Sequence, residues 1–198
     1  MSDKPRGFTL VELMVTLAVM SILLVLAIPS FNDFRQRAAV RGAADQIASF
    51  WGDARFEAVR RNALVKVGFV TNAAGDICLG ATTTKDPADD EACNCFSPTA
   101  CVVSRYPADQ SEWRRVRILG LPSMGDTDTD MQGVAIIDPK RANLTQAADV
   151  GGIAIQSPDG GNVYQLNVVV GRNGRAVVCE PDSAPAKLPQ YASRKCGA

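Results

Sequence analysis

Residues 6–29 form an almost entirely apolar stretch that reads Arg-Gly-Phe-Thr-Leu-Val-Glu-Leu-Met-Val-Thr-Leu-Ala-Val-Met-Ser-Ile-Leu-Leu-Val-Leu-Ala-Ile-Pro. Between Phe8 and Ile28 the only charged residue is Glu12. As an α-helix this run would be about 31 Å long, which is close to the thickness of the hydrocarbon core of a bilayer. The stretch therefore predicts a membrane helix with one unusual residue, the carboxylate near its start.

Three interpretations of this stretch differ in the role that they give to Glu12. A secretory signal peptide fits poorly, because the apolar run is long and Ala27-Ile28-Pro29 lacks the small-residue cleavage pattern. An ordinary membrane anchor leaves Glu12 unexplained, because a carboxylate in lipid is costly unless it is paired or neutral. In the third interpretation Glu12 is functional, and a partner brings a positive charge to it within the membrane.

The residues around Glu12, Gly7-Phe-Thr-Leu-Val-Glu-Leu13, resemble the class III signal of type IV pilins and type II secretion pseudopilins. This resemblance implies that a prepilin peptidase cuts between Gly7 and Phe8 and that the new N-terminal Phe8 is methylated. It also implies that Glu12 meets the N-terminal amine of a neighbouring subunit during filament assembly. An amine and a carboxylate can neutralise each other where neither is stable alone.

The composition limits the classes of function. The chain has 198 residues, which is enough for one domain after the helix. Without residues 1–7 it keeps 19 of its 21 basic and 20 of its 21 acidic residues, so it has no general attraction for nucleic acid. Histidine is absent, which excludes histidine-based catalytic triads and most zinc enzymes. We expect a non-enzymatic protein without a cofactor.

The cysteines predict disulfide bonds, because their number is even and a domain beyond an inner-membrane helix would lie in the oxidising periplasm. The six are Cys78, Cys93, Cys95, Cys101, Cys179 and Cys196. The last two enclose the C-terminal tail, and the resemblance to pilins, many of which close such a loop, implies that they pair. The other four allow three connectivities, and the sequence does not select one. The alternative, a four-thiolate metal site, is disfavoured by the single residue between Cys93 and Cys95.

The apolar pattern continues beyond Pro29, and we expect one helix from about Phe8 to about Asn62. From Phe31 to Ala58 apolar residues recur at steps of three or four or multiples of them, as in an amphipathic helix. After Asn62 the period changes to two, which predicts about six or seven strands. They are expected at residues 63–71, 77–79, 112–119, 133–137, 152–156, 162–170 and 175–179.

The predicted fold class is α+β, a pilin fold whose long N-terminal helix packs on the antiparallel sheets of a disulfide-stapled head. Residues 1–7 are the expected leader peptide and residues 8–29 the transmembrane or filament-core helix. Residues 30–62 continue the helix with an amphipathic face, and residues 63–198 form the β-rich head. Within the head, residues 80–101 are expected to be a disulfide-held loop, and the segment before Cys196 an irregular tail.

The order of a long helix, about seven strands and a late Gly-Arg before a C-terminal Cys resembles the GspH/FimT branch of minor pilins and minor pseudopilins. The resemblance implies a subunit that helps to start or cap assembly at the tip of a type IV pilus. Its partners would be the prepilin peptidase, other minor pilins, the major pilin and the assembly platform of the inner membrane. The chain would cross the bacterial inner membrane once, with a periplasmic head, before it joins the filament. The alternatives are a minor pseudopilin of a type II secretion system and a DNA-binding pilin of natural transformation.

The segment Val170–Cys179 carries the DNA-binding alternative. Some FimT-like pilins have a Gly-Arg-x-Arg motif here, but Val177 holds the second arginine position in this chain. A plain hairpin at Asn173-Gly174 explains the same residues. Binding to DNA phosphates would need several clustered cations. The residues that could supply them are Arg172, Arg175, Lys187, Arg194 and Lys195.

Alternating acids at Asp126, Asp128 and Asp130 suggest a calcium loop, and some pseudopilins bind calcium in loops. Here Met131 replaces the glycine that should follow, and Ile137 replaces the glutamate at the twelfth position. An acidic surface turn is therefore the main expectation, and calcium binding is the alternative.

Overall fold

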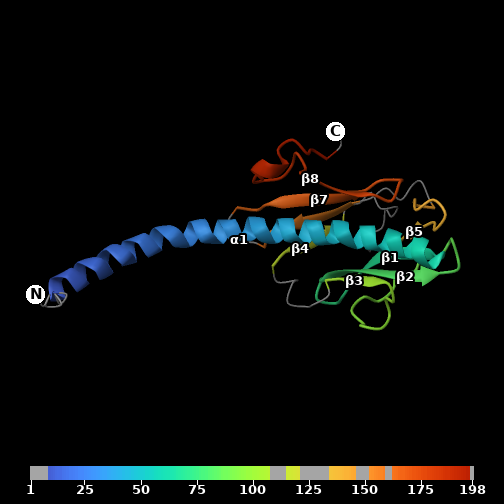
Figure 1. The fold of residues 1–198 in the computed structure, drawn as a ribbon, viewed down its shortest axis with the longest axis horizontal. Coiled ribbons are helices and arrows are strands. Elements are labelled where there is room, and N and C mark those ends of the chain that lie inside the picture. Colours follow the sequence, from blue (N-terminus) through green and yellow to red (C-terminus); the bar gives the residue numbers. More distant parts are fainter. Residues whose placement is uncertain (1–8, 108–114, 121–133, 146–151, 159–161, 197–198) are drawn as a thin grey trace, which may run out of the picture. The chain divides into compact units, whose positions relative to one another are not determined.

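The computed structural model describes residues 9–107, 115–120, 134–145, 152–158 and 162–196, without the side chains of residues 26–30. Contacts along the chain divide it into two units, Met1–Arg35 and Gln36–Ala198. The first unit contains the start of helix α1. The second unit, which we call the head, contains the rest of α1 and the described strands (Figure 1).

Helix α1 runs from Leu10 to Arg61, so the prediction of one helix that continues past Pro29 is confirmed. Its C-terminal end is a Schellman motif. The N–H of Ala63 donates to the carbonyl of Ala58, and the N–H of Asn62 donates to the carbonyl of Val59, each at 3.2 Å. Asn62 has a φ of 48°, a left-handed conformation that asparagine tolerates better than most residues. This motif turns the chain directly into the first strand.

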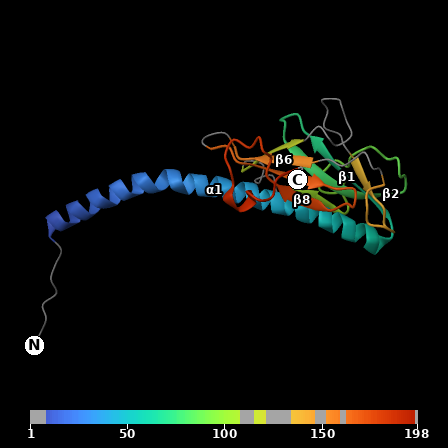
Figure 2. The same cartoon turned by 90° about the horizontal axis from the view of Figure 1, so that it is seen from above.

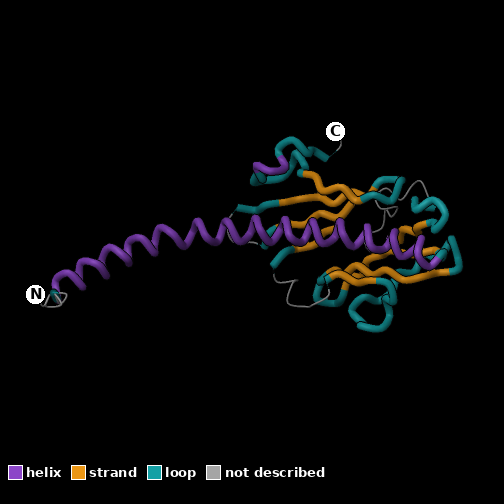
Figure 3. Tube along the Cα trace, viewed as in Figure 1, coloured by secondary structure: helices purple, strands orange, loops and turns teal. Residues whose placement is uncertain are grey.

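The described strands form two four-stranded sheets, which are antiparallel as predicted (Figure 3). The first sheet has the order β3-β2-β1-β5 and the second the order β4-β6-β7-β8. Their bounds are β1 Leu64–Thr71, β2 Ile77–Thr84, β3 Ser104–Tyr106, β4 Arg117–Gly120, β5 Val134–Ile137, β6 Gly152–Gln156, β7 Gln165–Val170 and β8 Ala176–Cys179. A short 3-10 helix, η2, follows at Pro189–Tyr191.

The first sheet differs from the sequence prediction in two places. β3 was not predicted, and the expected loop from residue 80 is wrong for its first residues because β2 continues to Thr84. Along its whole length β2 pairs with β1, from Leu64 opposite Thr84 to Thr71 opposite Ile77. The threonines at the end of β2 suit a strand, because β-branched residues pack well on a pleated sheet. The sequence interpretation took the abundance of threonine in this segment as a sign of a loop, which was wrong.

The second half of α1 supplies one wall of the core of the head. Its buried side chains recur at helical spacing and contact residues from both sheets: Val40, Ala43, Ala44, Ile47, Phe50, Trp51, Ala54 and Ala58. In Figure 1, β1, β2 and β3 lie below this part of the helix, and β7 and β8 lie above it. Figure 2 shows the same segment alongside the strands after a 90° turn. Four of these side chains are small alanines, whereas Trp51 and Ile47 are the largest fully buried side chains of the helix.

Candidate functional site

The N-terminal end of α1 is capped by Thr9. Its Oγ1 accepts a hydrogen bond from the N–H of Glu12 at 3.2 Å, and its carbonyl accepts one from the N–H of Leu13 at 3.2 Å. A threonine in this position satisfies one of the backbone donors that a helix start leaves without an intrahelical partner. Thr9 therefore fixes where the helix begins, three residues before the carboxylate.

Glu12 lies in the first turn of α1, and its side chain is exposed. A negative charge is favourable there because the backbone N–H groups give the helix start a partial positive charge. Thr9 and Glu12 also have the Thr-x-x-Glu spacing of a capping box. The sequence interpretation missed Thr9, although this spacing could have identified it. The position of Glu12 in the first turn of the helix is thus fixed, near the N-terminus that cleavage would create.

Apolar side chains surround the helix on all sides between Leu10 and Val25. Twelve large ones are between 51% and 74% exposed: Leu10, Val11, Leu13, Met14, Val15, Leu17, Val19, Met20, Ile22, Leu23, Leu24 and Val25. A helix that is apolar all round is typical of a buried or membrane environment. In the described part of the chain, no helix has a stretch long and apolar enough to cross a membrane. The predicted span covers residues 8–29, and Phe8 and the side chains of 26–30 lie outside the description.

Other predicted positions also lie outside the described residues. Gly7 and Phe8, the expected cleavage and methylation site, precede the described part of the chain. The candidate calcium ligands Asp126, Asp128 and Asp130 lie within residues 121–133, which are not described. Among the residues that are described, no three His, Cys, Asp or Glu side chains could together hold a metal ion.

The cysteines form three disulfide bonds, and two of them fasten residues 85–103, which we call the stapled loop. These bonds are Cys78–Cys95 and Cys93–Cys101. The third bond, Cys179–Cys196, is the pair that the pilin resemblance implies. The stapled loop covers the outer face of the first sheet, where Cys78, Cys95 and Cys101 form a small buried cluster with Val70 and Phe96.

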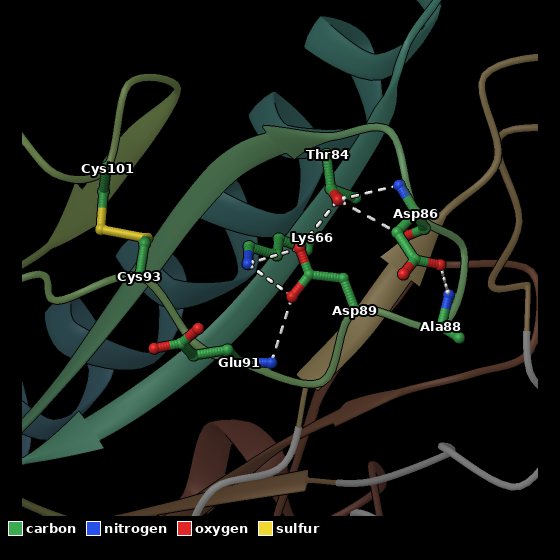
Figure 4. Close-up of polar contacts among 8 residues, drawn as sticks. All are labelled: Lys66, Thr84, Asp86, Ala88, Asp89, Glu91, Cys93 and Cys101. Atoms are coloured by element: carbon green, nitrogen blue, oxygen red, sulfur yellow. Dashed lines mark hydrogen bonds and ion pairs between the residues drawn. A yellow bond between two sulfur atoms is a disulfide. The ribbon is translucent and has the colours of Figure 1, made fainter.

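An ion pair fastens the same loop on its other side (Figure 4). The Nζ of Lys66 on β1 donates to both carboxylate oxygens of Asp89, at 2.8 and 2.7 Å. The Thr84 hydroxyl donates to Asp89 at 2.8 Å, and the N–H of Glu91 donates to it at 3.2 Å. The hydrogen bond from Lys66 is the main cause that lowers the pKa of Asp89, followed by the one from Thr84. Asp89 is therefore anchored in its charged form.

Two glycines make room for the stapled loop. Gly68 on β1 lies opposite Gly80 on β2, and both face the loop. A Cβ at position 80 would collide with the sulfur atoms of Cys93 and Cys101. A Cβ at position 68 would lie 2.8 Å from the Cβ of Ala92. Only glycine at these positions lets the loop lie directly on the sheet.

Two turns meet beside α1 at the end of the second sheet. The β7–β8 hairpin turns at Gly171–Arg175, where Gly174 has a φ of 66°, so the predicted hairpin is confirmed. The turn after β5 lies against it, because the N–H of Leu144 donates to the carbonyl of Arg172 at 3.1 Å. Arg55 of α1 fastens both turns. Its Nε donates to the carbonyl of Ala142 at 2.9 Å, and its side chain fills the space beside Gly174.

The C-terminal tail is organised by Glu180, which is completely buried. Its carboxylate accepts a hydrogen bond from the N–H of Leu188 at 2.6 Å and one from Lys195 Nζ at 3.3 Å. Lys195 also pairs with Asp182 at 3.3 Å. The sequence interpretation missed Glu180, because a glutamate before Pro181 carries no sign of burial.

The five cations that could supply the alternative DNA-binding patch are not brought together. Arg172 and Arg175 are exposed at the β7–β8 turn. Lys195 binds Glu180, which follows the opposite end of β8. At the usual rise of a strand, the Cα of Glu180 lies about 16 Å from that of Arg175. Lys187 donates to the carbonyls of Pro181 and Asp182 in the tail, and Arg194 lies over the ring of Tyr191. The structure instead places exposed Lys140 and Arg141, on the turn after β5, near the two hairpin arginines.

Comparisons with known proteins agree with the N-terminal features. A family model described as the prokaryotic N-terminal methylation motif matches residues 3–28. The pilin-like protein PilA1 of Thermus thermophilus is 33% identical over 117 residues, which cover 57% of this chain and 66% of that protein. The chain thus spans slightly less than two thirds of this relative. No solved structure matches the chain.

The matched motif includes Glu12 and the apolar surface of α1, and in this chain the helix is followed by antiparallel sheets with disulfide bonds. The alignment with PilA1 covers 117 residues, so it extends beyond the motif matched at residues 3–28. Together, the two matches support membership of the type IV pilin-like superfamily.

Proposed function

We propose that this chain is a structural subunit of a type IV pilus-type filament. It is made as a prepilin, held in the inner membrane by the first part of α1, and processed between Gly7 and Phe8. The observation that carries this proposal is the apolar surface all around Leu10–Val25, with Glu12 in its first turn. Such a surface requires lipid before assembly and apolar helices of neighbouring subunits afterwards.

Assembly then depends on replacing lipid contacts by helix contacts. Lipid tails are as apolar as leucine, so this exchange gains little from the hydrophobic effect and depends on close packing. Glu12 adds a directional element, because its carboxylate is stabilised only where a neighbour supplies a positive charge. The amine that cleavage exposes on Phe8 of the next subunit supplies it. Thr9 supports this pairing by fixing the first turn of the helix on which Glu12 lies.

Within the superfamily, we propose a minor pilin of the GspH/FimT type that helps to start or cap the filament at its tip. The architecture of the head supports this assignment, because α1 is followed directly by two four-stranded sheets. A minor pseudopilin of a type II secretion system is the alternative. Deleting the gene distinguishes them, because loss of pili supports the first and loss of secreted proteins with intact pili supports the second.

The role of Glu12 is tested with the substitutions Glu12→Ala and Glu12→Gln in the native host. We expect both variants to be cleaved and methylated like the wild type, because the peptidase site precedes them in the chain. Their amount in sheared filaments should fall at least about tenfold, a loss of roughly 1.4 kcal/mol or more per subunit contact. Normal amounts of both variants in filaments would contradict the proposed role of the carboxylate.

A further inference from the structure

The head carries charged surfaces of opposite sign on the two faces of its first sheet. Val65 and Val67 of β1 face α1 and belong to the main core. Lys66 lies between them in the sequence and therefore points to the other face, where it binds Asp89 of the stapled loop. The turns that Arg55 fastens lie on the side of α1. The loop and the two turns are thus separated by the sheet.

The surface on the side of α1 is basic, and we call it the basic surface. It consists of Lys140, Arg141, Arg172 and Arg175, which are all exposed. In the part of the chain that the structure describes, the side chains of these four residues make no ion pair. Asp138 is the one acid in the same two turns, and it accepts the backbone N–H of Lys140 at 2.7 Å. The backbone of the two turns that carry these cations is fastened by Arg55 and by the Leu144–Arg172 hydrogen bond.

The surface on the other side is acidic, and we call it the acidic edge. It consists of Asp86, Asp90 and Glu91, which are exposed on the stapled loop, with Lys85 beside them. Two disulfide bonds and the Lys66–Asp89 pair hold this loop although it contributes little to the main core. A loop that is already ordered loses less conformational entropy when it binds a partner.

We propose that the basic surface binds the acidic edge of a second copy of this chain. The inference rests on the proposed function, because two heads become neighbours when their helices join one filament. The basic surface has four cations and the acidic edge has three carboxylates, so the two surfaces are opposite in sign and carry nearly equal numbers of charges. They lie on different faces of the head, so the contact is heterologous and leaves one free surface of each kind on the pair.

A polyanion such as DNA is a weaker match to the basic surface. Nucleic-acid binding domains are usually basic overall, whereas this chain has 21 basic and 21 acidic residues and a pI of about 6.3. The acidic edge would also repel phosphates that extend beyond the four cations. A short acidic protein loop avoids both conflicts.

Zero-length carbodiimide crosslinking of the full-length protein in detergent tests the contact. The reagent joins a carboxylate to a lysine amine only where they touch, and Lys140 is the one lysine of the basic surface. Unlabelled and nitrogen-15-labelled protein are mixed, crosslinked at low salt, digested and analysed by mass spectrometry. We expect mixed-isotope peptides that join Lys140 to Asp86, Asp90 or Glu91. Crosslinks only within one isotope, or none from Lys140, would overturn the proposal.

Charge reversals then test the pairing while Lys140 remains as the reporter. Arg172→Glu and Arg175→Glu should each lower the mixed-isotope yield about threefold, in the range for exposed ion pairs. Lys85→Glu adds a negative charge to the acidic edge and should raise the yield. Arg194→Glu, the same change in the C-terminal tail, should leave it unchanged. Combining Arg172→Glu with Glu91→Arg should restore part of the yield.

Three results would contradict the pairing: an unchanged yield in both hairpin variants, an equal loss in Arg194→Glu, or no recovery in the combined variant. A duplex DNA shift that Arg172→Glu abolishes, without mixed-isotope crosslinks, would assign the basic surface to nucleic acid instead. The purified chain is used directly, so these outcomes do not depend on filament formation. A chain that crosslinks as expected but never enters filaments would refute the proposed function and leave the contact intact.

Discussion

Leu10–Val25 and Val40–Ala58 are two stretches of the same helix that differ in where their apolar side chains lie. In the first stretch these side chains surround the helix and are more than half exposed. In the second they occupy one face and are buried against the two sheets. The difference teaches that the head is stabilised from within, whereas the first stretch depends on surroundings that other molecules provide. Changes in the two stretches should therefore affect different measurements.

The largest expected effect on stability comes from Ile47→Ala in the second stretch. Ile47 is fully buried between the helix and the sheets. Removing its side chain leaves a cavity and should lower the free energy of unfolding of the head by about 2–5 kcal/mol. Denaturant unfolding of the full-length protein in detergent, followed by tryptophan fluorescence, measures this change because Trp51 lies in the same core.

Leu17→Ala is the matched change in the first stretch, where the side chain is 60% exposed. It should leave the unfolding of the head within about 0.5 kcal/mol of the wild type. Its effect should appear instead as a smaller amount of the subunit in filaments. If Leu17→Ala destabilised the head as much as Ile47→Ala, the division between the two stretches would be wrong.

A smaller effect is expected from Gly80→Ala beneath the stapled loop. The new methyl group collides with the sulfur atoms of Cys93 and Cys101, so the loop has to shift. Overpacking of this kind should lower the free energy of unfolding by about 1–3 kcal/mol. Gly52→Ala is the control, since nothing lies within 4 Å of a Cβ on this helical glycine. It should raise the stability by about 0.5–1 kcal/mol, and equal losses in both variants would contradict the close contact at position 80.

The smallest effect is expected from the pH dependence of the Lys66–Asp89 pair. The pKa of Asp89 is lowered in the folded protein, mainly by the hydrogen bond from Lys66. The pair therefore stabilises the fold above the ordinary aspartate pKa of about 3.9 and loses this contribution as the pH falls through the lowered folded value. Asp89→Asn should be less stable than the wild type at pH 7 and equally stable in strong acid. A constant difference at all pH values would show that the charge of Asp89 is not responsible.

Much of this fold could be predicted because its signals are local in the sequence. The long apolar run, the continued helical spacing to Ala58 and the change to a period of two gave the helix, its end at Asn62 and most strands. The turn at Asn173-Gly174 was predicted from its residue types. β3 has three residues and was missed, because so short a segment shows no period.

The parts that could not be predicted depend on contacts between distant residues. Spacing along the chain does not say which of Cys93 and Cys95 lies near Cys78, because both can reach it in an extended loop. The hydrogen bond from Arg55 to Ala142 joins residues 87 positions apart. The basic surface also joins residues that are distant in the sequence. Of the five cations considered for DNA binding, only Arg172 and Arg175 belong to it. Such groupings follow from the tertiary fold.

Mass spectrometry of the mature protein from its native host tests most directly that the first part of α1 is a processed assembly helix. The account predicts a chain that begins at Phe8, carries one methyl group on its N-terminal amine and retains Glu12 and the whole apolar stretch. An intact Met1 on the mature protein, or removal of the entire apolar stretch, would contradict it.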